Sequence, residues 1–232
     1  MSLSGVPQSY LGMWRRTLLE QGHALDATTL VLWIQTEQYH VDIRIPASRP
    51  SLESVEQLED YSFEQLVCLA SQQGFTGVTQ VKRNVAEWLR DHDYQPFNSR
   101  RDIAEMRFEN DHILIENGID ADYFERWEKV PNSDLNLSIR PCEGQDRHGT
   151  KVPARLFTSY KTFAYARPRS KPLPSADSIS EAISTHHPSK EELLDWLDFE
   201  ISFGEISDEN QGMITHSTFP FREGDALKFN EL

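Results

Sequence analysis

The first 130 residues repeat one pattern: short runs rich in β-branched and aromatic residues, each bounded by Gly, Pro, Asn or Asp. Such runs predict β-strands, because these side chains pack well on a pleated surface and the bounding residues favour turns. The predicted strands are 10–19, 28–36, 39–46, 75–82, 84–91, 103–109, 112–117 and 121–130. Short connections, such as Glu109-Asn110-Asp111, favour sequential antiparallel pairing into a closed barrel.

The rest of the chain carries a second set of strand signals. They cover 153–160, 162–167, 197–206 and 212–219, and they follow a polar, turn-rich stretch around Pro141. We therefore expect two units, residues 8–130 and residues 131–232. The second unit either extends the first barrel or forms a partial barrel packed on it, and no internal repeat decides between these arrangements.

Three serines mark helix starts. Ser62 is followed by Gln65, Ser178 by Glu181 and Ser189 by Glu192, the spacing of a capping box. The first of these helices ends at Gly74. The predicted fold class is all-β with a minor α component: an antiparallel barrel, a second β unit, and two or three short helices.

The net charge of the chain argues against two classes of binding partner. Thirty-seven acidic side chains against 23 basic ones give a formal net charge of −14, which repels nucleic acid and anionic lipid. No apolar run reaches the roughly 18 to 20 residues of a membrane span, and no basic stretch followed by an apolar one begins the chain. We expect a cytoplasmic protein with no nucleic acid and no membrane among its partners. Cys68, in a helix, and Cys142, in a loop, are expected as reduced thiols.

Several predicted strands have one apolar and one strongly polar face. Val41, Ile43 and Ile45 alternate with His40, Asp42 and Arg44. Three other segments alternate in the same way. Met106 and Phe108 alternate with Glu105 and Arg107, and Phe199, Ile201 and Phe203 alternate with Asp198, Glu200 and Ser202. Tyr123, Glu125 and Trp127 alternate with Phe124 and Arg126. The ordinary interpretation places the polar face outside. If other elements cover the outer surface, the charged face instead lines a polar, ligand-sized lumen, and both interpretations stand.

One run resembles a known family. Gly12-Met13-Trp14-Arg15-Arg16 is similar to the Gly-x-Trp signature in the first strand of lipocalins, and the resemblance covers about 120 residues. It implies that Gly12, Trp14 and Arg126 close one end of the barrel, with the Arg126 guanidinium over the Trp14 ring as a cation–π contact. The chain departs from lipocalins in lacking a secretion signal and in having about 100 further residues after the eighth strand.

Four further segments, residues 14–16, 32–36, 42–46 and 217–224, are similar to a family of uncharacterised bacterial proteins. That family is distantly similar to a fungal protein with lipocalin-like domains. The resemblance implies a calycin-like fold and brings no established chemistry.

Common catalytic signatures are missing: there is no Gly-rich phosphate loop, no Gly-x-Ser-x-Gly, no His-Glu-x-x-His and no dinucleotide fingerprint. The sequence therefore predicts no cofactor. It also predicts no metal, because His186 and His187 belong to a Pro- and Ser-rich connection and His92 lies at a strand end.

The first functional hypothesis is a cytosolic small-molecule binding protein with an aromatic and charged lumen, suited to a small anionic or carboxylate ligand. A cavity lined by Trp33, Gln35, Arg44 and Trp127 is expected. The candidate ligand-binding residues are Trp14, Arg16, Trp33, Gln35, Arg44, Trp88, Arg107 and Trp127.

Two alternatives stand beside it. One is a cofactor-independent hydrolase, lyase or isomerase, with Glu125 or Asp42 as base and Arg16 or Arg44 holding the substrate. The other is a protein-interaction module that docks through acidic stretches and the Pro-rich connection at 168–188. The sequence leaves the oligomeric state open, a homodimer included.

Overall fold

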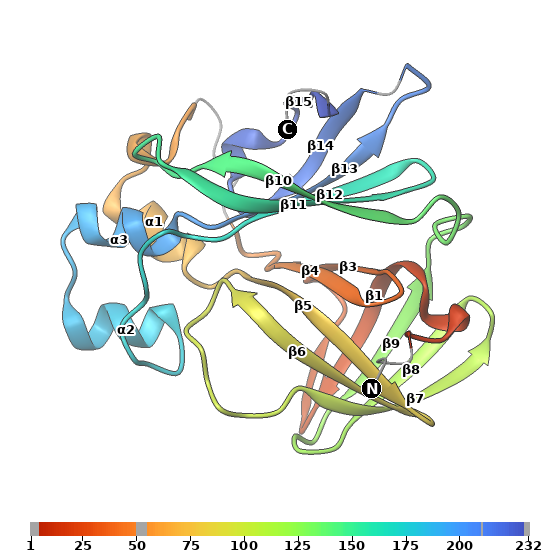
Figure 1. Cartoon of the computed structure of the whole chain (residues 1–232). Helices are drawn as coiled ribbons and strands as arrows, with labels where there is room; N and C mark the ends of the chain where they lie inside the picture. The colour runs from red at the N-terminus through yellow and green to blue at the C-terminus, as the bar shows by residue number, and fades with distance from the viewer. Residues whose placement is uncertain (1–4, 50–54, 210, 230–232) are drawn as a thin grey trace.

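Eight strands close into an antiparallel barrel. In the computed structural model, which describes residues 5–49, 55–209 and 211–229, β1 pairs with β3 on one side and with β9 on the other (Figure 1). The barrel strands are β1 (Gly12–Gln21), β3 (Leu30–Gln35), β4 (Tyr39–Ile45), β5 (Gln73–Lys82), β6 (Val85–Asp93), β7 (Ile103–Asn110), β8 (Ile113–Gly118) and β9 (Phe124–Lys129). All eight predicted strands are confirmed. A short β2 (Ala24–Asp26), absent from the sequence prediction, pairs with the end of β1.

The second half forms a separate six-stranded antiparallel sheet. Its strands are β10 (Ser138–Gln145), β11 (Lys151–Ser159), β12 (Thr162–Arg167), β13 (Glu200–Ile206), β14 (Gly212–Ser217) and β15 (Ala226–Leu227). Within the described ranges, none of them pairs with a barrel strand, so the second unit is a half-barrel and not an extension of the first. Cys142 lies in β10, which corrects its placement in a loop. The division into two domains at residue 130 stays a prediction.

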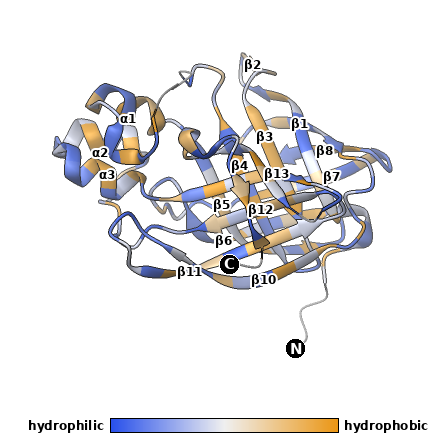
Figure 2. Ribbon diagram, turned by 90° about the horizontal axis from the view of Figure 1, so that it is seen from above, coloured by the Kyte–Doolittle hydropathy of each residue, from blue (hydrophilic) through white to orange (hydrophobic). Residues whose placement is uncertain are grey.

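The half-barrel covers one side of the barrel (Figures 1 and 2). The outer faces of β3 and β4 present Ile34, Val41 and Ile43, which pack with Phe157 and Ile201 of the second sheet in one hydrophobic core. Burying each such side chain stabilises the fold by about 1.5–3 kcal/mol. This core explains why β4 has a continuous apolar face on the outside of the barrel.

The ordinary interpretation of the alternation is therefore wrong for β4. Since Val41 and Ile43 face the second sheet, His40, Asp42 and Arg44 face into the barrel. On β7 the ordinary interpretation holds, because Met106 packs inside with the barrel tryptophans while Arg107 is exposed.

The three predicted helices are confirmed as α1 (Phe63–Leu69), α2 (Ile179–His186) and α3 (Lys190–Leu197). The end of α1 differs from the prediction, because the helix ends at Leu69 and Gly74 already lies in β5. Ser62, Ser178 and Ser189 each accept a hydrogen bond from the backbone N–H three residues later, as the sequence predicts. The helices gather at one end of the two sheets (Figure 2). None of the helices in the described ranges is long and apolar enough to cross a membrane.

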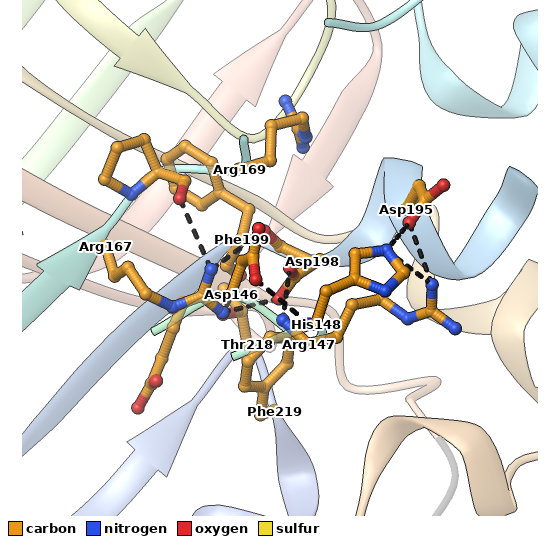
Figure 3. Close-up of polar contacts among 12 residues, drawn as sticks. Asp146, Arg147, His148, Arg167, Arg169, Asp195, Asp198, Phe199, Thr218 and Phe219 are labelled. Carbon is orange, nitrogen blue, oxygen red and sulfur yellow. Dashed lines mark hydrogen bonds and ion pairs between the residues drawn. The ribbon is translucent and has the colours of Figure 1, made fainter. Parts of the chain in front are cut away.

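A buried ion pair fixes the end of α3 to the half-barrel. Arg167 Nη2 donates to Asp198 Oδ1 at 2.6 Å, and the second oxygen of Asp198 accepts the backbone N–H of Arg147 at 2.9 Å (Figure 3). The Arg147 side chain then reaches Asp195 on α3. These contacts join the β10–β11 turn, the end of β12 and α3.

One end of the barrel closes differently from the lipocalin-based expectation. Trp14 lies inside, as expected, but Arg126 faces outward and pairs with Glu128, because residue 126 alternates with the inward Glu125 and Trp127. Lys129, opposite Trp14 in the β1–β9 ladder, places its Nζ 5.7 Å from the Trp14 ring centre. Gly12 has a φ of +120°, and a Cβ there would lie 2.7 Å from Ser133 Oγ, so only glycine fits this close approach.

Candidate functional site

The middle of the barrel is filled by four tryptophans. The Trp33 ring lies edge-on to Trp88 at 5.9 Å and to Trp127 at 5.7 Å, and stacks with Trp14 at 6.3 Å between ring centres. The four come from β1, β3, β6 and β9, whose inward positions the alternation sets. They form a packed aromatic floor, so the lumen is not open from end to end.

A layer of ionisable side chains lies on this floor, toward the other end of the barrel. Arg16 Nη1 donates to Glu125 Oε1 at 2.7 Å and Arg16 Nη2 donates to Asp26 at 2.8 Å. The Arg16 and Glu125 side chains are only 4% and 3% exposed. On β4, Arg44 Nε donates to Asp42 at 2.9 Å, and Arg44 Nη1 lies 3.8 Å from Glu125. Predicted residues from three strands thus converge in one buried cluster.

A cavity of about 370 Å³ opens above the cluster. Its polar lining includes Arg16, Asp26, Arg44, Arg90, Asp102, Glu116, Tyr123 and Glu125. Below it is a smaller pocket of about 10 Å³, lined in part by Trp33, Asp42, Glu116 and Trp127. The lower pocket has room for about one water molecule, whereas the upper cavity is in the range of small-ligand sites.

Glu116 and Glu125 face each other across β8 and β9 in the lining of the upper cavity. Tyr123 donates its hydroxyl to Glu116 Oε1 at 2.7 Å. Burial, reinforced by the charges of Glu125 and Asp102, raises the pKa of Glu116 well above its usual value. Burial also raises the pKa of Glu125, although Arg44 and Arg16 oppose that shift. Of the two carboxyls, burial and the neighbouring acidic charges thus favour the protonated form most strongly at Glu116.

Arg90 and Asp102 bridge the part of the barrel where β6 and β7 separate. The two strands pair from Val85 to Glu87, and the Trp88 N–H donates to the Asp102 carbonyl oxygen at 2.9 Å. Beyond that point Arg90 Nη2 donates to the Asp102 side chain at 2.5 Å. The Arg90 guanidinium also lies 3.6 Å above the Phe75 ring centre. This ion pair closes the wall of the site where backbone hydrogen bonds do not.

Deeper in the barrel, Gln35, His40 and Thr79 form a hydrogen-bonded set. Thr79 donates its hydroxyl to Gln35 Oε1, so His40 Nδ1 donates to Thr79 and His40 Nε2 carries a lone pair. Burial, with the charge of Arg90, lowers the pKa of His40 to about 3, so the ring is neutral. Gln35 lines neither cavity, which corrects its expected place in the ligand site.

Four buried polar atoms of the lumen have no hydrogen-bond partner among the described residues. They are Trp33 Nε1, Trp127 Nε1, His40 Nε2 and Glu125 Oε2. A buried polar group without a partner costs about 1–3 kcal/mol, and native proteins rarely leave one unpaired. Two donors and two acceptors are thus available to water or a ligand inside the barrel.

The structure brings most predicted site residues together and leaves three outside the cavities: Gln35, Trp14 and Arg107. Arg16, Asp42, Arg44, Trp33, Trp88, Trp127 and Glu125 all line the cavities described above. Trp14 is part of the aromatic floor and lines neither cavity. Arg107 is an error of the prediction: its side chain is 62% exposed on the outer face, beside Glu109, because it alternates with the inward Met106.

Five residues that line the upper cavity are absent from the sequence prediction: Asp26, Arg90, Asp102, Glu116 and Tyr123. Glu116 could have been found, because it alternates with Ile115 and shares the inward face of Leu114. Asp26 and Asp102 could not have been found in this way, because they lie at the ends of strands, where the alternation of residues does not show which way a side chain points. Within the described residues, no group of three His, Cys, Asp or Glu side chains is placed to hold a metal ion.

Comparison with known proteins bears on the fold only. No protein-family model and no curated protein matches the chain. A solved structure of an uncharacterised protein from Saccharomyces cerevisiae is similar, with a TM-score of 0.51 and 12% sequence identity. The alignment covers 89% of this chain and 84% of the yeast chain. The yeast structure supports the barrel architecture and carries no information on activity.

Proposed function

We propose that this chain is a small-molecule binding protein and that the ligand occupies the 370 Å³ cavity at the charged end of the barrel. The observation that carries the proposal is Glu125 Oε2, an ionisable oxygen buried in the cavity wall without a partner among the described residues. A ligand group there would satisfy it, while Arg16 holds the other oxygen of the same carboxylate in place.

The architecture adds support of a general kind. An eight-stranded antiparallel barrel encloses a volume suited to one small ligand, the use that lipocalins make of it. Gly12 and Trp14 occupy the first-strand positions that the resemblance to lipocalins implies, so a lipocalin-like or calycin-like barrel is part of the proposal. A cytoplasmic location belongs to it too, supported by Cys68 and Cys142, which form no disulfide.

A thermal-shift screen tests the proposal, because a ligand that binds only the folded state must stabilise it. The library contains small amines, carboxylates, neutral alcohols and amides. We expect hits whose stabilisation is lost in Glu125→Gln and kept in Glu128→Gln, a matched change on the exposed face of the same strand. Hits that stabilise both variants equally, or no hits at all, would contradict binding in the lumen.

An enzyme is the second candidate, favoured by one observation. Glu116, whose pKa is raised by burial, and Glu125, which is held by Arg16, give the site a carboxyl that can donate a proton beside one that can accept it. The test incubates each screening hit with the protein in D₂O and follows it by proton NMR. An enzyme would convert the compound or exchange its protons, and Glu125→Gln would abolish this. A hit that stays unchanged over many hours with the wild-type protein identifies a binding protein.

A further inference from the structure

The carboxyl groups of the lumen outnumber its guanidinium groups. Five carboxyls line the two cavities: Asp26, Asp42, Asp102, Glu116 and Glu125. Three guanidiniums line them, those of Arg16, Arg44 and Arg90, and none of the lysines in the described part of the chain does. The cluster thus has an excess of two acidic groups, 5 against 3, in a place where burial makes unbalanced charge costly.

Each guanidinium is already engaged by the protein. Arg16 donates to Glu125 and Asp26, Arg44 donates to Asp42, and Arg90 donates to Asp102 and Asp93. An anionic ligand would have to displace one of these carboxylates and would add to the acidic excess. The charge balance therefore opposes the anionic ligand that the sequence suggests.

The acceptors of the cluster are not all engaged. Arg16 holds Glu125 Oε1, while Glu125 Oε2 is buried with no donor among the described residues. Opposite it, Glu116 receives only the Tyr123 hydroxyl among the hydrogen bonds of its side chain in the described residues. The two carboxyls share one face of the cavity and are cross-strand neighbours.

We propose that the lumen site takes a small organic cation, a primary ammonium or guanidinium group, whose N–H donors lie between Glu116 and Glu125. This inference rests on the proposed function of the lumen and names the ligand class. Hydrogen bonds between an ammonium and carboxylates are the strong, charge-assisted type. The cation also reduces the acidic excess of the cluster from two groups to one, 5 against 4.

Proton release accompanies binding in this account. The charged groups facing Glu116 are Glu125 on β9, Asp102 before β7 and Arg44 on β4, with Tyr123 as its hydrogen-bond donor. A bound ammonium favours the ionised form of Glu116, so the carboxyl loses its proton as the ligand enters. Affinity then rises with pH, by up to about tenfold per pH unit while one proton is released per ligand.

Isothermal titration with three probes of the same shape tests the ligand class: benzylamine, benzyl alcohol and benzoate. We expect benzylamine to bind at least about tenfold more tightly than the other two, a difference of about 1.4 kcal/mol. Glu125→Gln should remove this preference, and Glu128→Gln should keep it. Because a buried substitution can impair folding, Glu116→Gln is the second variant, and it should abolish the rise of benzylamine affinity as the pH increases above 4.5, the ordinary pKa of a glutamate.

The possible outcomes separate the ligand class from the proposed function. If benzoate or benzyl alcohol binds as well as benzylamine, and Glu125→Gln changes its affinity, the lumen is a binding site and the cation preference is wrong. If benzylamine binds with an affinity that neither glutamate substitution changes, its site is elsewhere and the inference fails. If none of the three probes binds, the inference is also overturned, while the broader thermal-shift screen still decides the proposed function.

Discussion

Glu116 and Glu125 lie directly opposite each other on adjacent strands, and both face the cavity of the barrel. Like charges in such cross-strand positions destabilise a sheet. In this structure Arg16 donates a hydrogen bond to Glu125, and the Tyr123 hydroxyl donates one to Glu116. The arrangement is a specific one, and its energetic consequences can be measured.

Replacing Glu116 with Gln should make stability less sensitive to pH. The folded pKa of Glu116 is raised above its ordinary value of 4.5, so the native state keeps a proton that the unfolded chain loses. Stability from this group is complete below about pH 4.5 and is lost as the pH rises toward the folded pKa. Urea denaturation should show little difference from wild type at pH 4 and a more stable Glu116→Gln variant at pH 8. Equal differences at both pH values would contradict the assignment, and Glu128→Gln is the control.

Removing Arg16 should be severely destabilising. Arg16→Ala leaves the buried Glu125 carboxylate without its main partner, and breaking a buried pair in this way costs about 3–5 kcal/mol. The double variant Arg16→Met, Glu125→Gln removes both charges and should recover more than half of that loss. Arg107→Ala, on the exposed outer face, should change the free energy of unfolding by less than about 0.5 kcal/mol. A loss below about 1 kcal/mol for Arg16→Ala would show that the pair is not buried as described.

Lys129 and not Arg126 should stabilise the closed end of the barrel. The Lys129 Nζ lies 5.7 Å from the Trp14 ring centre, and cation–π contacts of this kind contribute about 0.5–1 kcal/mol. Lys129→Met should cost that amount in chemical denaturation, part of it from the ion pair with Asp134. Arg126→Met should be close to neutral. A larger loss of stability for Arg126→Met than for Lys129→Met would instead support the contact between Arg126 and Trp14 that the resemblance to lipocalins implies.

Asp198 should be essential for the position of α3. It pairs with the buried Arg167 and accepts the backbone N–H of Arg147 (Figure 3). Asp198→Ala should cost about 3–5 kcal/mol, because it leaves the Arg167 charge buried without a carboxylate. Asp208→Ala removes a carboxylate that is 90% exposed and should cost less than about 1 kcal/mol. Hydrogen exchange would locate the effect. If the α3 amides were protected equally in Asp198→Ala and in the wild type, this role of Asp198 would be contradicted.

The strands could be predicted from the sequence because alternation and turn residues are local signals. β10 was missed because Pro141 and Gly144 indicate a turn there, and an edge strand tolerates proline that a central strand would not. The direction of the β4 faces could not be derived either, because it depends on the second sheet covering Val41 and Ile43. The tryptophans of the site and half of its charged residues were identified, whereas Asp102 and Tyr123 reach it from outside regular strands.

The most direct test of the central claim uses the indole N–H signals of the tryptophans in a ¹H–¹⁵N NMR spectrum. Trp33, Trp88 and Trp127 line the lumen cavities, whereas Trp196 lies on α3 and serves as an internal control. Titration with a hit from the thermal-shift screen should shift the Trp33 and Trp127 signals, which have no acceptor within the described protein, and leave Trp196 unchanged. A stabilising ligand that shifts Trp196 or only surface amides, and leaves Trp33 and Trp127 unmoved, would show that the barrel lumen is not the binding site.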